Sequence, residues 1–209
     1  ASFRKAGLDP ETPPKTWPET FEFAKKIKAS GQSCGMTSTW LTWIHLENFS
    51  AWNNLPYATD QNGLTSLTPE LKINGPLNIR HFSTLAELQK DGTFQYGGRT
   101  SEAKAKFLNG ECAMLPESSG GIGDMVKAGL DFGTGNLPYY PEAAGAPQNT
   151  VPGGASLWVF AGKPAADYKG VAQFFTFLSK TDVQSRLHQV SGYLPATMAA
   201  YEQSKKDGF

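Results

Sequence analysis

The segment Cys34-Gly-Met-Thr-Ser-Thr-Trp-Leu-Thr-Trp-Ile-His-Leu-Glu-Asn-Phe-Ser-Ala-Trp52 decides the fold that the sequence predicts. Its beginning is strand-like and its remainder helix-like, with Trp40 and Trp43 at the junction, where open α/β sheets bind ligands. Residues three apart share a helix face, so we expect both indoles to point to one side. They would form an apolar wall suited to the C–H face of a polyol or sugar. The alternative is that both are ordinary core residues.

The composition excludes several functional classes. The chain has 209 residues, 39% of them hydrophobic, which is enough for one large domain or parts of two. Its 19 Lys and Arg residues balance 19 Asp and Glu residues, so no net field attracts nucleic acid or an anionic membrane. The longest apolar stretches, such as Ser156–Ala161, are strand-sized, so we expect a chain that is not embedded in a membrane.

A helix near the N-terminus carries its own start and stop signals. Thr16 is a good N-cap, and Glu19 three residues later completes a capping box. Pro18 lies in the first turn, and Gly31 follows the last one. The sequence therefore predicts a helix between these signals.

Strand and helix signals alternate along the rest of the chain, which favours an α/β fold with a largely parallel sheet. We expect strands at about 34–38, 112–115 and 155–161. Helices are expected at about 76–90, 101–109, 122–126, 169–178, 182–190 and around 198–201. The region 137–154 is rich in Pro, Gly and Ala, which is typical of a linker or a crossing between lobes.

The two cysteines, Cys34 and Cys112, are too far apart in sequence for a zinc site. Each lies at the start of a predicted buried strand, and we expect those strands to be neighbours. A disulfide would then form in an oxidising compartment, and two buried thiols are the alternative. The sequence does not decide between them.

Four further residues suit an anionic ligand. Ser118 and Ser119 lie between a strand end and a helix start, where hydroxyls and backbone N–H groups can bind a phosphate; plain N-capping is the alternative. Gly154 would let a backbone N–H approach a phosphate closely, or it is a hinge glycine without ligand contact. Tyr193 lies in a Gly-Tyr-Leu-Pro turn, where its phenol would reach a ligand or simply pack in the loop.

An enzyme is the main alternative from another class. A glycoside or phosphodiester hydrolase would combine aromatic platforms with carboxylates such as Glu47 and Glu117. The 3 histidines show no metal-ligand spacing, and no nucleophile elbow, P-loop or dinucleotide fingerprint is present. We therefore expect no catalytic residue, metal or cofactor. Glu47 and Asn48 are interpreted as a solvated helix face or as makers of local hydrogen bonds.

Six motifs follow one another in an informative order: Lys5–Pro10, Trp40–Asn53, Asn109–Met114, Ser118–Gly120, Gly153–Val159 and Gly192–Pro195. With them the chain resembles, over essentially its whole length, the maltose-binding-protein-like solute-binding family of bacterial ABC importers. Within that family it resembles the periplasmic glycerol-3-phosphate-binding members. The resemblance implies a type II periplasmic-binding fold, in which two α/β lobes are joined by hinge strands and hold the ligand between them.

Members of this family are about twice as long, so the chain is similar to their central stretch. Residues 1–150 would then form a C-terminal-type α/β lobe with the Trp and Ser motifs, and residues 151–209 a hinge strand and helices of the other lobe. The family also implies a Tyr, a Glu and a Ser from an N-terminal segment and an Arg from a C-terminal segment, both outside these residues.

The implied function is capture of glycerol-3-phosphate or a glycerophosphodiester and its delivery to the membrane permease subunits of an importer. The location would be the periplasm, or a lipid-anchored position outside a Gram-positive cell. Glu117 departs from the family pattern and would repel a phosphate dianion, which favours a partly esterified ligand. An oligosaccharide receptor of the same fold is the alternative among binding proteins. The implied ligand contacts are Trp40 and Trp43 on the glycerol moiety, with Ser118, Ser119, Gly154 and Tyr193.

Overall fold

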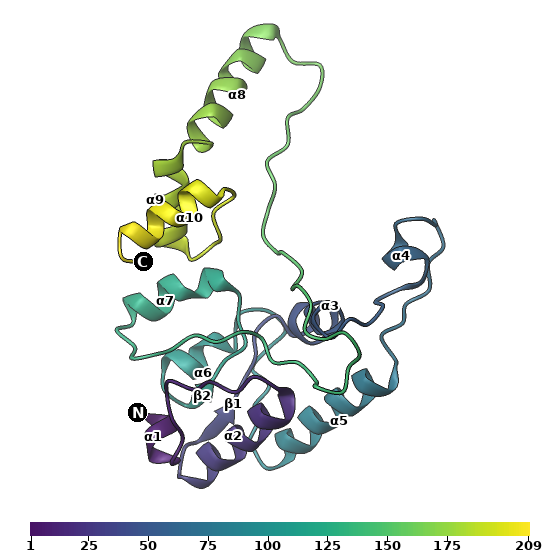
Figure 1. Cartoon of the computed structure of the whole chain (residues 1–209), viewed down its shortest axis with the longest axis vertical. Helices are drawn as coiled ribbons and strands as arrows, with labels where there is room; N and C mark the ends of the chain where they lie inside the picture. Colours follow the sequence, from purple (N-terminus) through teal and green to yellow (C-terminus); the bar gives the residue numbers. More distant parts are fainter. The chain divides into compact units, whose positions relative to one another are not determined.

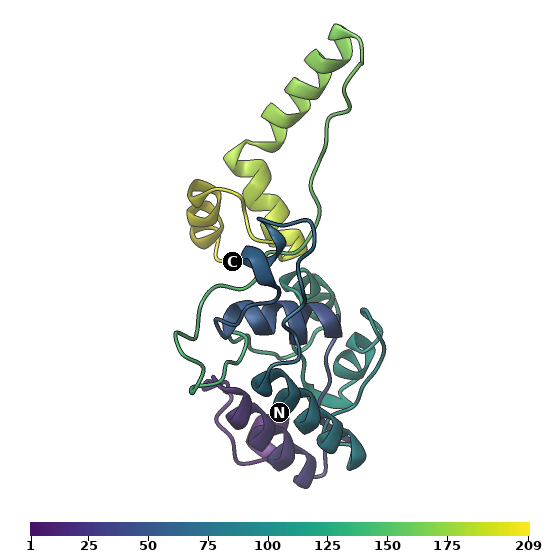
Figure 2. The same ribbon diagram turned by 90° about the vertical axis from the view of Figure 1, so that its right-hand side faces the viewer.

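The computed structural model describes all residues from 1 to 209, and Figures 1 and 2 show its elements. The chain divides into two compact units. The first comprises residues 1–117 and 131–152, and the second comprises residues 118–130 and 153–209. The expected division at residue 150 between parts of two lobes stays a prediction, and residues 118–130 lie in the second unit.

A two-stranded parallel sheet lies at the centre of the first unit. Strand β1 (Cys34–Met36) pairs with β2 (Cys112–Met114), with Cys34 opposite Cys112 and Met36 opposite Met114. The two cysteines form a disulfide whose Cα atoms are 4.4 Å apart. The predicted parallel neighbours are therefore confirmed, and of the two alternatives for the cysteines the structure has the bridge.

The strand predicted at 155–161 is wrong. These residues form no strand, and Leu157 and Trp158 are 62% and 85% exposed. A strand needs a neighbour for its backbone N–H and C=O groups and a layer that covers its side chains. No segment of these 209 residues pairs with it, so the apolar pattern by itself does not form a strand.

Helix α2 (Trp17–Ala29) covers the sheet of the first unit. The predicted capping box is confirmed, because the Thr16 side chain accepts from the Glu19 backbone N–H and the Glu19 carboxylate accepts from the Thr16 N–H. The helix lies directly against β1: a Cβ added at Gly35 would be 2.2 Å from the Ala24 carbonyl oxygen. Glycine is therefore required there by the close approach of two backbones.

The first unit contains further helices besides α2. The predicted helix at 76–90 is confirmed as α5 (Pro76–Lys90). A helical segment that begins at Leu41 contains the π-helix η1 (Trp43–Asn48) and continues as α3 (Phe49–Trp52). Three short helices complete the unit: α1 (Ser2–Lys5), α4 (Thr59–Gly63) and α6 (Lys104–Leu108).

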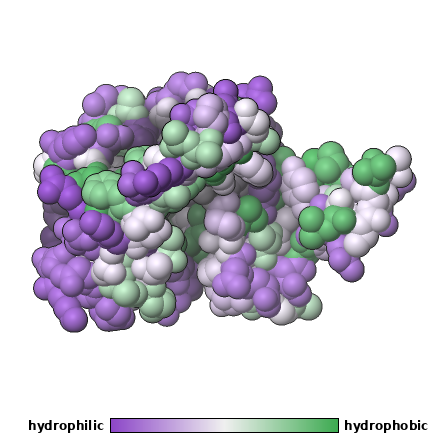
Figure 3. Space-filling model, turned by 90° about the horizontal axis from the view of Figure 1, so that it is seen from above, coloured by the Kyte–Doolittle hydropathy of each residue, from purple (hydrophilic) through white to green (hydrophobic).

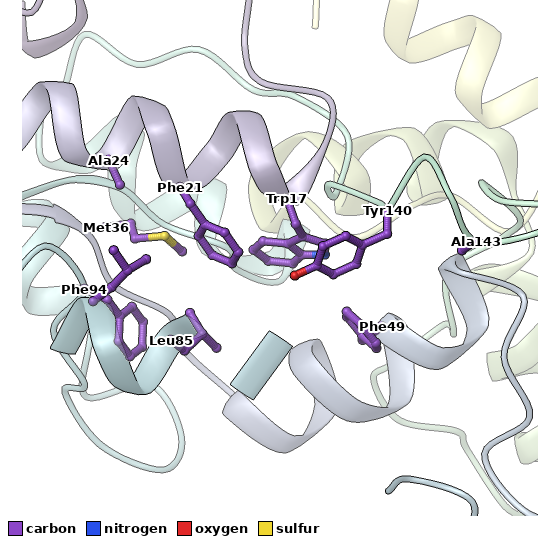
Figure 4. Packing of buried hydrophobic residues seen from close by; sticks show 10 residues of the cluster. Trp17, Phe21, Ala24, Met36, Phe49, Leu85, Phe94, Tyr140 and Ala143 are labelled. Carbon is purple, nitrogen blue, oxygen red and sulfur yellow. The ribbon is translucent and has the colours of Figure 1, made fainter. Parts of the chain in front are cut away.

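The core of the first unit is aromatic, as Figure 4 shows. Trp17 and Phe21 of α2 face Met36 of β1, Phe49 of α3 and Tyr140 from the segment 131–152. Two buried histidines lie in the same cluster of rings. His45 and His81 stack with ring centroids 5.1 Å apart, and Trp17 lies 4.5 Å from the His81 ring.

The second unit is helical. It contains the 3₁₀ turn η2 (Ser119–Gly121), α7 (Ile122–Lys127), α8 (Ala165–Leu178), α9 (Thr181–Ser191) and α10 (Met198–Lys206). The helices expected there are thus confirmed, with ends within a few residues. Helix α9 ends at Gly192, whose φ of 75° is left-handed and whose added Cβ would meet the Ser119 carbonyl oxygen at 2.2 Å.

Apolar side chains also lie at the surface, where Figure 3 shows green hydrophobic residues among purple hydrophilic ones. The most exposed include Leu64, Leu67, Trp158, Phe160 and Leu194. None of the helices combines the length and the apolar character that crossing a bilayer requires.

We predict that the disulfide stabilises the first unit. It closes a loop with a sequence separation of 78 residues, and native bridges of this kind contribute about 2–5 kcal/mol by restricting the unfolded chain. The variant with both Cys34→Ser and Cys112→Ser should lower the free energy of unfolding by that amount in urea titrations. An unchanged midpoint and slope would show that β1–β2 pairing and core packing hold the sheet without it.

We predict that acid weakens the fold well above the range in which carboxylates titrate. Burial lowers the pKa of His45 to about 3 and also lowers that of His81, whereas both are near 6.5 in the unfolded chain. The unfolded state therefore binds more protons below pH 6.5, and stability falls between pH 7 and pH 5, by about 2 kcal/mol for His45, with His81 acting in the same direction. Urea unfolding followed by intrinsic tryptophan fluorescence should show this slope, and His81→Gln should make it smaller. A stability that is flat over this range would contradict the burial of neutral rings.

Candidate ligand-binding site

Trp40 occupies a strained turn at the carboxyl end of β1. Its φ is 44°, in the left-handed region, which costs a bulky residue about 1–2 kcal/mol. Two backbone hydrogen bonds hold it: its N–H donates to Thr100 O at 2.8 Å, and its carbonyl accepts from Ile44 N at 2.9 Å. The prediction that Trp40 and Trp43 share a helix face is therefore wrong, because Trp40 precedes the helix that begins at Leu41.

Both tryptophans remain accessible at this turn. Trp40 is 40% exposed, and Trp43, the first residue of η1, is half-buried. Neither belongs to the buried core cluster, which contradicts the alternative of ordinary core residues. Strained backbone concentrates at functional sites, where surrounding contacts compensate its cost. Trp40 combines a left-handed φ with an accessible aromatic ring, which makes the Thr39–Trp40 turn a candidate site feature.

Asn48 is a supporting residue whose main contact the sequence did not reveal. It is 3% exposed, its Nδ2 donates to the Trp43 carbonyl at 3.0 Å, and its Oδ1 accepts from Val151 N at 2.9 Å. The expectation of local hydrogen bonds is confirmed for Trp43, whereas that of a solvated face is wrong. The sequence offered little signal for this contact, because the partner lies 103 residues away.

Glu117 is buried and paired. Its side chain is 5% exposed, and its carboxylate lies 3.8 Å from the Lys104 ammonium. An adjacent cation offsets much of the repulsion that a carboxylate exerts on an anion. The expected conflict between Glu117 and a phosphate is therefore weaker than its charge alone suggests.

The second unit brings three predicted site residues together. The Ser118 hydroxyl accepts from Gly120 N at 3.2 Å as the N-cap of η2, and Ser119 is the first residue of that turn. Tyr193 packs on the same turn, because a Cβ added at Gly120 would lie 3.0 Å from its Cζ. The Tyr193 ring is half-exposed, so two hydroxyls and a phenol gather at one accessible place.

Gly154 stands apart from these contacts. Its φ of 108° suits glycine alone, and a Cβ added there would have no atom within 4 Å. The conformational requirement is thus real, while a contact with a ligand stays a prediction. The same holds for the expected convergence on one cleft, since Trp40 and Trp43 belong to the first unit and the other candidates to the second.

A hollow of the first unit contains none of the predicted residues. It measures about 520 Å³ and lies between α3 and the loop around Gln61, with Asn54 and Gln148 in its wall. Its amides bond within the chain: Asn54 donates to Ala144 O, and Asn62 accepts from two backbone N–H groups. We interpret it as a structural hollow of the loop.

The comparisons with known proteins agree along the whole chain. Residues 3–208 match the model of the family described as bacterial extracellular solute-binding protein. The chain is 65% identical over all 209 residues to the "sn-glycerol-3-phosphate-binding periplasmic protein UgpB" of Rhizobium meliloti (strain 1021), and 48% identical to the protein of that name from Escherichia coli (strain K12). In each case it spans 48% of the relative's length.

Solved structures show the same fold. UgpB from Mycobacterium tuberculosis in complex with glycerophosphocholine superimposes with a TM-score of 0.71 at 18% identity, over 98% of this chain and 51% of that one. The cyclic α-maltosyl-1,6-maltose binding protein from Arthrobacter globiformis gives a TM-score of 0.65 at 21% identity, over 98% of this chain and 52% of that one. The predicted α/β, type II periplasmic-binding fold is thereby confirmed for the half that the chain covers. This chain belongs to the bacterial extracellular solute-binding protein family.

Proposed function

We propose that this chain is part of an extracytoplasmic receptor that captures glycerol-3-phosphate or a glycerophosphodiester for an ABC importer. The observation that carries the proposal is the 65% identity over the whole chain to a protein named for binding sn-glycerol-3-phosphate. The chain spans about half the length of such relatives, so the activity belongs to a longer protein.

The accessible Trp40 and Trp43 supply the apolar part of the site. Their indole faces suit the C–H groups of a glycerol backbone, and a rigid aromatic surface loses little entropy on binding. The strained turn at Trp40 and the Asn48 clamp on Trp43 fix both backbones before the ligand arrives. A prearranged wall of this kind increases affinity because less ordering is left to the binding step.

The phosphate would be held by donors of the second unit. Ser118, Ser119 and Tyr193 supply hydroxyl groups at the η2 turn, and Gly154 would supply a backbone N–H. Hydrogen bonds to a charged acceptor are worth more than neutral ones, so these contacts would select a phosphate over an uncharged sugar. The Lys104–Glu117 pair makes both a monoester and a diester acceptable.

The partners of this function are the polyol phosphate ligand and the membrane permease subunits of the importer. An oligosaccharide receptor of the same fold is the second candidate, and the resemblance to maltose-type structures at 21% identity supports only the shared fold. A hydrolase is the third, and nothing in the arrangement of Glu47 and Glu117 favours it, since Glu117 is buried against Lys104.

We predict that a protein of the relatives' full length carrying these residues binds glycerol-3-phosphate or glycerophosphocholine and not maltose. Calorimetric titration with all three ligands makes the comparison. Trp40→Ala and Trp43→Ala should each weaken binding about tenfold or more, as the loss of a stacking aromatic costs roughly 1–3 kcal/mol. The control is Trp52→Ala, because Trp52 lies on the same helical segment and outside the predicted site.

Two outcomes would contradict the proposal. Tight binding of maltose with no response to either phosphate ester would favour the oligosaccharide receptor. Release of free phosphate or choline from the esters would favour a hydrolase.

We predict that the 209-residue chain by itself binds glycerol-3-phosphate only at millimolar concentration or not at all. The family resemblance assigns a Tyr, a Glu, a Ser and an Arg of the site to segments outside these residues. Each lost charge-assisted phosphate partner costs about 1.5–3 kcal/mol, which is tenfold or more in affinity. Micromolar binding in the same calorimeter would show that the residues of this chain form a sufficient site.

A further inference from the structure

A chain of four polar side chains crosses the aromatic core of the first unit and ends at the Trp40 turn. The Tyr140 hydroxyl lies 3.3 Å from His81 Nδ1, and His81 Nε2 lies 2.8 Å from His45 Nδ1. His45 Nε2 in turn lies 2.9 Å from Ser38 Oγ, which lies 3.0 Å from the Thr39 carbonyl oxygen. Ser38, His45 and His81 are fully buried, so their side chains bond within this network. The Tyr140 hydroxyl at its outer end also accepts a hydrogen bond from the Arg80 guanidinium.

The protons of this network can form all of its hydrogen bonds in one direction only. The Thr39 carbonyl can only accept, so the Ser38 hydroxyl must donate to it and accept from His45 Nε2–H. His45 Nδ1 is then an acceptor for His81 Nε2–H, and His81 Nδ1 accepts the Tyr140 proton. In the opposite direction Ser38 would donate to His45, and the Thr39 carbonyl would lose its side-chain donor.

The surroundings keep both rings neutral, as this assignment requires. Burial lowers the pKa of His45 to about 3. Burial, the neighbouring His45 and the Arg80 guanidinium lower that of His81 well below its usual value. Five uncharged rings pack on His81: Trp17, Phe21, Phe49, Phe82 and Tyr140.

Ser38, the last residue of the network, fixes the orientation of the peptide group between Thr39 and Trp40. The carbonyl of this peptide accepts from Ser38, and its N–H donates to Thr100 O at 2.8 Å. A flip of the peptide would change ψ of Thr39 and φ of Trp40 together and relax the left-handed φ of 44°. Both polar ends of the peptide must therefore be held for the strained turn to persist.

We propose that Tyr140, His81, His45 and Ser38 form a positioning network that orients Trp40 for its ligand. The Tyr140 hydroxyl sets the tautomer of His81 and through it that of His45, and this directs the Ser38 hydroxyl onto the Thr39 carbonyl. The network is a property of this fold, and only its role in binding rests on the proposed function. None of the four residues touches the ligand in this scheme, so all act through Trp40.

Nitrogen NMR of the chain labelled with ¹⁵N-histidine tests the direction of the bonds. At pH 7 His45 and His81 should both carry their proton on Nε2, with a coupling across the hydrogen bond between His81 Nε2 and His45 Nδ1. His188 is an internal control with the opposite tautomer, because its Nδ1 lies 2.7 Å from the Tyr193 carbonyl, which can only accept. A proton on His45 Nδ1, or a charged ring, would overturn the proposal.

Two variants test the effect on Trp40. In the 5-fluorotryptophan-labelled chain, Ser38→Ala and Tyr140→Phe should shift the Trp40 resonance, which is assigned by its loss in Trp40→Phe. The matched control is Thr37→Val, since Thr37 is equally buried and its hydroxyl donates to Gln95 O outside the network. An unmoved Trp40 resonance in Ser38→Ala would overturn the proposal. Should Tyr140→Phe fail to fold, the wild-type tautomers and Ser38→Ala still decide.

Ligand titration separates this network from the function itself. In the full-length protein, Ser38→Ala and Tyr140→Phe should weaken glycerol-3-phosphate binding about 3- to 10-fold, the equivalent of one hydrogen bond, and Thr37→Val should not. Wild-type affinity in Ser38→Ala, together with a loss in Trp40→Ala, would refute the network and leave the function intact. If no phosphate ester binds while the tautomers and the Trp40 shift are as expected, the proposed function fails and the network stands.

Discussion

The parallel pairing of β1 with β2 is the constraint on which the first unit depends. The Cys34–Cys112 bridge ties the two strands at their amino ends, and α2 packs so closely on β1 that Gly35 has no room for a side chain. Because the strands run in the same direction, their carboxyl ends open at the same edge. Thr39 after β1 then reaches Pro116 after β2, and its N–H and hydroxyl both donate to the Pro116 carbonyl at 3.3 Å. The turn that carries Trp40 grows out of this edge.

The interior behind that turn is unusual in relying on polar contacts. Most cores are filled with apolar side chains, because an unpaired polar group is costly to bury. Here His45 and His81 pair with each other and with a hydroxyl at either end, so their polar nitrogens have partners. Such networks define one arrangement more sharply than apolar packing does, which is what a turn with a left-handed tryptophan needs. Because the two histidines are buried as neutral rings, the same network makes the stability of the fold sensitive to acid.

The two units contribute different chemistry to the proposed receptor. The first offers an aromatic wall at Trp40 and Trp43, and the second offers hydroxyls at the η2 turn with Tyr193 packed on it. In the proposed function, which rests on the 65% identity to a glycerol-3-phosphate-binding relative, these features would serve a ligand with an apolar backbone and an anionic end.

The sequence by itself determined the features that depend on near neighbours. The helix after Thr16 follows from a capping box whose groups lie three residues apart, and α5, α8 and α9 lie where local helix signals predict them. The short strands at the cysteines and their parallel α/β arrangement were also predictable. For Trp40 and Trp43 the sequence offered an accessible apolar wall as one of two interpretations. Ser118 and Tyr193 were predictable as candidates, because hydroxyls at a turn have a recognisable pattern.

Only the tertiary structure decided the features whose partners are distant. Residues 155–161 have a strand pattern but no strand, since pairing depends on another segment. Trp40 departs from the helix because Thr100 and Ser38 hold the peptide before it. His45 and His81 are 36 residues apart, and Asn48 and Val151 are 103 apart. A local pattern reports the propensity of one segment, whereas these contacts are made when packing excludes water and each buried polar group must find a partner.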